Sequence, residues 1–225
     1  MGQVISSILP EAVGVAISPV PIIAVVLLLA TPRGKGNGLA LLLGWLVGLA
    51  AVGTIVLLLA DPAEAAGDDG PPDWVGWFIL ILGVLAVLGG LGQYRNRPRG
   101  DDEPAMPKWM STVDKFTPGR SAAIGLALAA VNPKNLTLTL AAAAAIAGAG
   151  LDTGESYLTL AIFVIIGTIG LAIPIGIYFL GGDKASETLN DLRHWLAVHN
   201  PAIMTVLFIV IGMKLIGSGL QTILT

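Results

Sequence analysis

The stretch Val131-Asn132-Pro133-Lys134-Asn135 decides how the rest of this chain is interpreted. It interrupts residues 121–148, which otherwise consist mainly of alanine, leucine, glycine, isoleucine and threonine and are long enough to cross a membrane. A proline within a helix removes one backbone hydrogen bond and clashes with the carbonyl one turn back. A lysine at the centre of a bilayer costs about 2.5–3.5 kcal/mol on insertion scales. Because spanning a membrane requires neither residue, the pattern indicates a broken membrane helix in which the proline and the lysine both have a role.

The composition is that of a polytopic membrane protein. Of the 225 residues, 55% are apolar and only 12% are charged, and the mean hydropathy is +0.83. Soluble domains carry about 25% charged residues. We expect an all-α integral membrane protein with six transmembrane helices, each near the roughly 20 residues that a bilayer requires. The predicted spans are residues 9–30, 38–60, 74–93, 121–148, 156–180 and 202–222.

The composition also argues against several kinds of function. The chain has no cysteine, which excludes thiol redox chemistry and thiolate metal sites. Its net charge of −3 gives no indication of nucleic-acid binding. The sequence contains no Walker loop and no arrangement typical of a catalytic serine, histidine and aspartate. We therefore expect no enzyme, no cofactor and no bound metal.

The basic residues indicate the orientation. If the six spans alternate in direction, the connections 31–37, 94–120 and 181–201 lie on one side and hold ten of the twelve basic residues. The opposite side holds none, because the other two, Lys134 and Lys214, lie within predicted spans. The positive-inside rule then makes the basic connections cytoplasmic and puts the N-terminus and the C-terminus outside.

The two halves of the chain show a related pattern. The first span carries Ser18-Pro19-Val20-Pro21 and the fourth carries Asn132-Pro133-Lys134, each a small polar residue followed by proline. Residues 83–91 and 212–220 also align, since both begin with glycine and end with Gly-Leu. An odd number of spans per unit makes two copies cross in opposite directions. We predict two inverted three-helix repeats; the alternative is that two apolar runs of low complexity align by chance.

These repeats define the predicted organisation of the chain. Residues 1–93 form the first repeat and residues 121–225 the second, with broken helices in spans 1 and 4. Residues 94–120 form a cytoplasmic basic linker that contains a short amphipathic helix.

The two helix breaks provide the candidate site. A half-helix that begins at membrane depth presents free N–H groups and a positive dipole end, which attract anions. The candidate residues are Ser18, Pro19, Pro21, Asn132, Pro133, Lys134, Asn135 and Lys214. Lys134 is expected to bind a carboxylate, phosphate or sulfate of a cargo, or to exchange a proton. Lys214 fits a structural or a functional role equally, Glu11 is expected to be a solvated terminal residue, and both breaks are also compatible with purely structural kinks.

At these motifs the chain resembles the LysE transporter superfamily, whose members typically carry Gly-x-x-x-x-Pro-Gly-Pro in span 1 and Asn-Pro-Lys in span 4. The first element here is Gly14-Val15-Ala16-Ile17-Ser18-Pro19-Val20-Pro21, with Val20 in place of the middle glycine. Within the superfamily the chain is most similar to the GAP or Sap-like branch, the glycopeptidolipid- and sulfolipid-addressing proteins of bacterial envelopes. The stretch from Thr31 to Gly38 supports that similarity. The resemblance implies a bacterial plasma-membrane protein.

The resemblance further implies export, or assistance to export, of small solutes or envelope lipids. We expect a secondary transporter of anionic or zwitterionic solutes or envelope glyco- or sulfolipids, with a site at mid-membrane where helices 1 and 4 break. The alternative is a non-transporting membrane scaffold that assists envelope lipid assembly or export. Expected partners are membrane lipids and a small-molecule or lipid cargo. A homo-oligomer and an envelope lipid-export machinery are the open alternatives for protein partners.

Overall fold

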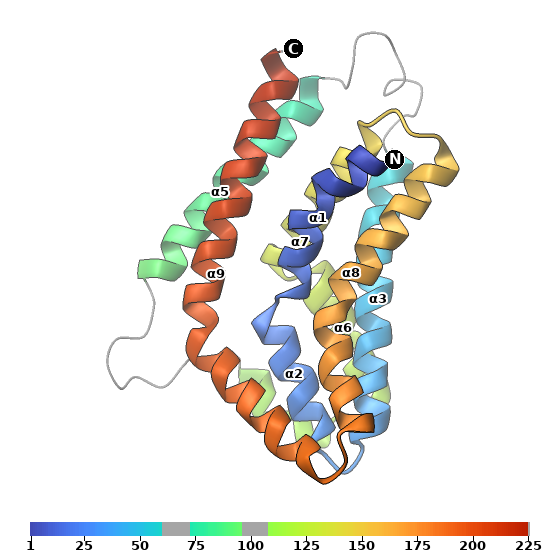
Figure 1. Ribbon diagram of the computed structural model, residues 1–225, viewed down its shortest axis with the longest axis vertical. Coiled ribbons are helices and arrows are strands. Elements are labelled where there is room, and N and C mark those ends of the chain that lie inside the picture. The colour runs from blue at the N-terminus through green and yellow to red at the C-terminus, as the bar shows by residue number, and fades with distance from the viewer. Residues whose placement is uncertain (60–72, 96–107, 225) are drawn as a thin grey trace.

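The computed structural model describes residues 1–59, 73–95 and 108–224, and in these ranges the chain is a bundle of helices (Figure 1). The α-helices are α1 (Gly2–Ala16), α2 (Pro19–Leu29), α3 (Gly34–Leu59), α5 (Asp73–Arg95), α6 (Pro118–Ala130), α7 (Pro133–Ala147), α8 (Thr153–Leu180) and α9 (Ala185–Leu224). Two 3-10 helices, η1 (Lys108–Lys115) and η2 (Gly182–Lys184), connect them. Helices run through each of the six segments predicted as spans, so the prediction of an all-helical fold is confirmed.

Both predicted helix breaks are present. Residues 17–18 separate α1 from α2, whose axes differ in direction by 46°. Val131 and Asn132 separate α6 from α7. Each second half-helix begins in the same way, with a polar N-cap, Ser18 or Asn132, followed by a proline at the first helical position. Proline is favoured there because its missing N–H would have no helical partner and its φ already suits a helix.

Several of the helices are long and apolar enough to cross a membrane. Among the described residues, α3, α5, α8 and α9 meet this condition, and the bent pair α1–α2 makes a fifth span if the two halves are counted as one. The chain is therefore a multi-pass membrane protein by its helix lengths and composition. Helices α6 and α7 have 13 and 15 residues, each shorter than a bilayer requires. The predicted number of six spans depends on these two helices acting together.

Helix α9 differs from the sequence-based expectation. Its 40 residues begin at Ala185, so most of the predicted connection 181–201 is helical and continuous with the last span. In Figure 1 the first part of α9 crosses the lower end of the bundle before the helix turns upward beside α5. Pro201 lies inside α9, and a proline within a helix is the usual cause of such a kink. The boundary predicted between the connection 181–201 and the last span is thus a bend in one helix.

Glycines allow α5 and α9 to pack closely as an antiparallel pair. A Cβ on Gly83 would come within 2.9 Å of the carbonyl oxygen of Gly212, and a Cβ on Gly212 within 2.8 Å of that of Gly83. Gly76 and Gly219 face each other in the same reciprocal way. Small residues let membrane helices approach until their backbones touch, which provides packing energy where no hydrophobic driving force acts.

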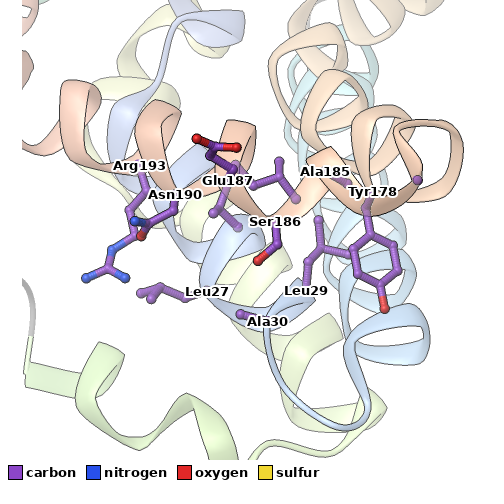
Figure 2. Close-up of a pocket in the computed structure, with 12 residues that line it drawn as sticks. Leu27, Leu29, Ala30, Tyr178, Ala185, Ser186, Glu187, Asn190 and Arg193 are labelled. Atoms are coloured by element: carbon purple, nitrogen blue, oxygen red, sulfur yellow. The ribbon is translucent and has the colours of Figure 1, made fainter.

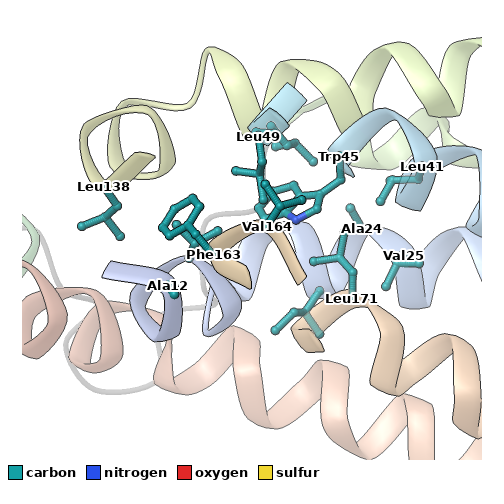
Figure 3. Close-up of a cluster of buried hydrophobic side chains, with 14 of the residues drawn as sticks. Ala12, Ala24, Val25, Leu41, Trp45, Leu49, Leu138, Phe163, Val164 and Leu171 are labelled. Carbon is teal, nitrogen blue, oxygen red and sulfur yellow. The ribbon is translucent and has the colours of Figure 1, made fainter. Parts of the chain in front are cut away.

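The core of the other helices lies between α1, α3 and α8 (Figure 3). Trp45, Leu49 and Phe163 are fully buried there, and the indole Nε1–H of Trp45 donates a hydrogen bond to the Gly167 carbonyl at 3.3 Å. In the predicted linker 94–120, η1 buries Met110 and Val113, while residues 96–107 lie outside the described ranges. This core holds α1 and α7 beside each other, which positions the two helix breaks.

Candidate functional site

The structure brings the two helix breaks into direct contact. The ammonium of Lys134, at the start of α7, donates a hydrogen bond to the Ser18 hydroxyl at 2.6 Å. It also donates to the carbonyl oxygen of Ile17 at 3.4 Å. Both acceptors lie in the α1–α2 break, more than a hundred residues earlier in the chain. The prediction that these motifs meet in space is therefore correct.

Asn135 links the same two segments through its amide. Its Nδ2 donates to the carbonyl oxygen of Leu128 in α6 at 3.0 Å, which fixes its Oδ1 toward Ser18. The Ser18 hydroxyl lies 2.8 Å from Asn135 Oδ1 and 2.7 Å from the carbonyl oxygen of Val15. A hydroxyl carries a single proton and can donate to only one of them at a time. The network therefore has two alternative hydrogen-bonding states.

The remaining predicted residues shape the breaks. The Asn132 side chain accepts a hydrogen bond from the backbone N–H of Lys134 at 3.1 Å and so caps α7. Asparagine suits this position because its oxygen satisfies an N–H that has no partner within the helix. Pro19 and Pro21 are buried at the start of α2. The structure thus assigns Asn132 a capping contact and brings Ser18, Lys134 and Asn135 together as one side-chain network.

The electrostatic surroundings of Lys134 differ from those predicted. The residue is only 3% exposed, and within residues 1–59, 73–95 and 108–224 no carboxylate forms an ion pair with it. Its ammonium instead faces the carbonyl end of α1, where the helix dipole is negative and stabilises a cation. The sequence predicted only the positive N-terminal ends at the breaks. A break creates a helix C-terminal end as well, and in this structure the ammonium of Lys134 contacts the C-terminal end of α1.

Lys214 belongs to a separate contact. Its Nζ lies 2.8 Å from both carboxylate oxygens of Glu11 in α1 and also contacts the carbonyl oxygen of Ser7. Glu11 is only 2% exposed, so the expectation of a solvated residue is wrong. Glu11 precedes Ser18 by seven residues, which corresponds to about 10 Å along a helix. The sequence did contain a signal for this pair, because opposite charges inside apolar spans usually pair with each other.

Comparison with known families identifies the chain's relatives. Residues 8–221 match the sequence profile described as Sap, sulfolipid-1-addressing protein. The chain belongs to this family. Comparisons with proteins of curated function and with solved structures give no match. The Sap-like part of the predicted resemblance is confirmed, whereas membership of the wider LysE superfamily stays a prediction.

Both charged contacts lie within the region that defines the Sap family. The matched residues 8–221 include the Lys134 network and the Glu11–Lys214 pair. They also include both helix breaks and the glycine-lined contact between α5 and α9. The features described above therefore lie inside the family domain of this Sap-family chain.

Proposed function

We propose that this Sap-family chain is a secondary transporter that exports an anionic or zwitterionic envelope lipid or small solute. The chain is a membrane protein linked to the handling of envelope lipids, by its family and by its apolar helices. The proposal adds that the chain itself moves the cargo, with the Lys134 network as the cargo-binding element. The proposal includes a location in the bacterial plasma membrane, with the basic connections in the cytoplasm.

One observation carries the proposal, namely a buried ammonium between two broken helices with no carboxylate partner in the described part of the chain. A cation inside a membrane is costly and usually marks a substrate or ion pathway. The neutral contacts to Ser18 and Ile17 compensate the charge of Lys134 only in part. A phosphate, sulfate or carboxylate would compensate it more fully, since hydrogen bonds between charged groups are about twice as strong as neutral ones.

The burial of Lys134 describes the closed state of the proposed site. Cargo would reach the ammonium only after the α1–α2 break separates from the α6–α7 break. The Ser18 hydroxyl then no longer accepts from the ammonium, but it can still donate its proton to the carbonyl oxygen of Val15, which belongs to the same side of the separating breaks and lies 2.7 Å away. The site can therefore open without leaving the hydroxyl unpaired, which would cost about 1–3 kcal/mol.

The proposal includes six spans in two inverted repeats. In this arrangement α6 and α7 together form the fourth span, and their break is the counterpart of the break between α1 and α2. The contacts of α5 and α9 support it. Gly90 approaches the backbone nitrogen of Ile209, and Gly219 approaches that of Leu80. Position 219 lies 129 residues after position 90, and position 209 lies 129 residues after position 80. The two contacts are therefore equivalent if the second repeat follows the first by 129 residues, and the same difference separates Gly83 from Gly212.

The experiment that tests the proposed function is reconstitution of the purified full-length chain alone in proteoliposomes. Sulfated and phosphorylated lipids placed in one leaflet should appear in the other with wild-type protein. Lys134→Ala should insert normally and reduce this movement to the level of empty liposomes. Lys35→Ala is the matched control, because Lys35 is an exposed lysine in the first turn of α3, away from both helix breaks. Transport by Lys134→Ala at the wild-type rate would overturn the assignment of the site.

The alternative function, a scaffold that presents lipids to another machine, predicts a different result. The first part of α9 favours this alternative, because Trp195 and Val198 are exposed on a helix that crosses the end of the bundle. A scaffold would bind lipids in the proteoliposomes but would move none of them until a second protein is added. Lipid movement by the chain alone excludes this alternative.

A further inference from the structure

A second site lies at the end of the bundle where α2, α8 and α9 meet. A cavity of about 610 Å³ opens there, within the range of roughly 300–1,000 Å³ that ligand sites occupy (Figure 2). None of its lining residues belongs to the Lys134 network or to the Glu11–Lys214 pair. The cavity is therefore separate from the site proposed above.

The cavity has one apolar wall. The C-terminal end of α2 provides Val26, Leu27 and Leu29, and Leu189 of α9 adds a further buried apolar side chain. Leu27 is only partly buried although it belongs to an otherwise buried helix end. This wall provides a surface on which a hydrocarbon chain gains free energy by leaving water.

The opposite wall is polar and carries an arginine. Ser186, Asn190 and Arg193 are spaced at four and three residues along α9, which places them on one face of the helix. Arg193 is partly buried, and within the described ranges its guanidinium forms no hydrogen bond or ion pair. In Figure 2 the carboxylate of Glu187 points away from Leu27 and Ala30, whereas the Ser186 hydroxyl points toward Ala30. Ser186, Asn190 and Arg193 can therefore each act as a hydrogen-bond donor at this wall.

The position of the cavity matches a membrane surface. It lies where α2 ends and α9 begins, at the end of the bundle that also contains Arg33 and Lys184. Basic residues at this depth attract anionic lipid headgroups. A soluble anion would not require the apolar wall, and a hydrocarbon chain would not require Arg193. An amphiphile with an anionic headgroup fits both walls.

We infer that this cavity binds a membrane lipid whose headgroup carries a phosphate or a sulfate. The headgroup contacts Arg193, Asn190 and Ser186, and the first part of an acyl chain lies against α2. A guanidinium suits this task because its two parallel N–H groups match two oxygens of a phosphate or sulfate. Binding at this cavity is independent of transport; only its further role, as the loading site for cargo, rests on the proposed function.

Helix α2 connects this cavity with the Lys134 network. Its C-terminal end lines the cavity, and Ser18 directly precedes its N-terminal end, about 16 Å away for 11 residues. A lipid that moves the end of α2 therefore acts on the helix that holds the α1–α2 break. In the loading role, binding at Arg193 precedes the separation of Ser18 from Lys134.

The test measures lipid binding by the purified full-length chain in detergent, with native mass spectrometry. The probes are dioleoyl-phosphatidylglycerol, sulfatide and dioleoylglycerol, which has the same chains as the first probe without an anionic headgroup. Wild-type protein should prefer both anionic lipids over dioleoylglycerol. Arg193→Gln should weaken their binding about tenfold or more and leave dioleoylglycerol unchanged, with Arg193→Lys between the two.

Two controls distinguish binding in this cavity from a general attraction of anionic lipids to basic residues and from a site for free anions. Arg33→Gln removes a charge at the same end of the bundle but outside the cavity, and it should leave the affinities unchanged. Equal losses in Arg33→Gln and Arg193→Gln, or wild-type binding by Arg193→Gln, would overturn the inference. Soluble glycerol phosphate that binds as tightly as phosphatidylglycerol would overturn it too, by showing a site for free anions. Arg193→Gln should weaken lipid binding by the same factor in a Lys134→Ala background, so that failure of the proposed transport leaves this result intact.

Discussion

Lys134 and Lys214 lie within the predicted spans, and the structure compensates their charges in opposite ways. Lys214 is about one third exposed and forms a bidentate contact with the buried carboxylate of Glu11. Lys134 is almost fully buried and contacts only a hydroxyl and a carbonyl oxygen. The more accessible lysine therefore has the full counter-charge, and the less accessible one has none among the described residues.

This difference indicates different roles for the two cations. A buried ion pair is strongly destabilised when either partner is removed, because the other charge remains in an apolar environment. Glu11 and Lys214 connect α1 to the α5–α9 pair, and their contact is part of how these helices hold together. Removal of the Lys134 charge leaves no buried counter-ion behind. The charge of Lys134 is thus available to a ligand, whereas the charge of Lys214 is already paired with Glu11.

The largest expected effect concerns Lys134→Met, which keeps the side-chain length and removes the charge. We expect transport in proteoliposomes to fall to background, because the group that binds the anion is lost. The free energy of unfolding in mixed micelles should change by about 1 kcal/mol or less, since neutral partners of a buried charge retain other contacts. Loss of stability by several kcal/mol, together with normal transport, would reverse the roles assigned to the two lysines.

The second prediction concerns the glycine contact that positions the helix carrying Lys214. A Cβ at Gly83 would lie 2.7 Å from the backbone nitrogen of Ile216, so Gly83→Ala should force α5 and α9 apart. Overpacking of this kind costs about 2–3 kcal/mol. Gly89→Ala is the matched control in the same helix, because its Cβ would find only ordinary contacts with Phe208 at 3.9 Å. Equal thermal stability of the two variants would contradict this packing.

Much of the fold could be predicted because hydrophobic runs and prolines act locally. The run lengths predicted the helices, and a proline after a polar residue predicted both breaks at Ser18 and Asn132. The continuity of α9 through Pro201 could not be predicted, because a proline either ends or bends a helix depending on the packing around it. The glycines aligned at positions 83 and 212 predicted a relation between two segments, but not that they touch each other.

The candidate site was predicted in its members more than in its geometry. The predicted repeat favoured a site formed by both breaks, and Ser18, Lys134 and Asn135 do meet. The sequence could not show that Lys134 faces the carbonyl end of α1, because each break creates both a positive and a negative helix end. The cavity near Arg193 was missed altogether, since α2 and α9 are far apart in the chain and only the tertiary fold brings them together.

The third prediction tests the ion pair between Glu11 and Lys214. Lys214→Met should reduce the free energy of unfolding by about 2 kcal/mol, below the 3–5 kcal/mol for a fully buried pair, because Lys214 is about one third exposed. The double variant Glu11→Gln/Lys214→Met should recover most of this loss, since no buried charge remains without a partner. A double variant that is less stable than Lys214→Met would show that Glu11 is stabilised by other groups.

The smallest effect is expected for Ser18→Ala, which leaves Lys134 in place and removes its nearest acceptor. Asn135 Oδ1 loses its donor and the ammonium keeps only the Ile17 carbonyl, which should cost about 1 kcal/mol of stability. Transport should fall severalfold without being abolished, because the charge proposed to bind cargo remains while its position is less restricted. Ser6→Ala is the control, since the Ser6 hydroxyl also donates to a carbonyl three residues back, at 2.7 Å, but on an exposed turn. If Ser18→Ala abolishes transport as completely as Lys134→Met at normal stability, the hydroxyl takes part in moving the cargo or a proton. If it has no more effect than Ser6→Ala, Lys134 needs no positioning by the α1–α2 break, and the contact between the two breaks is structural.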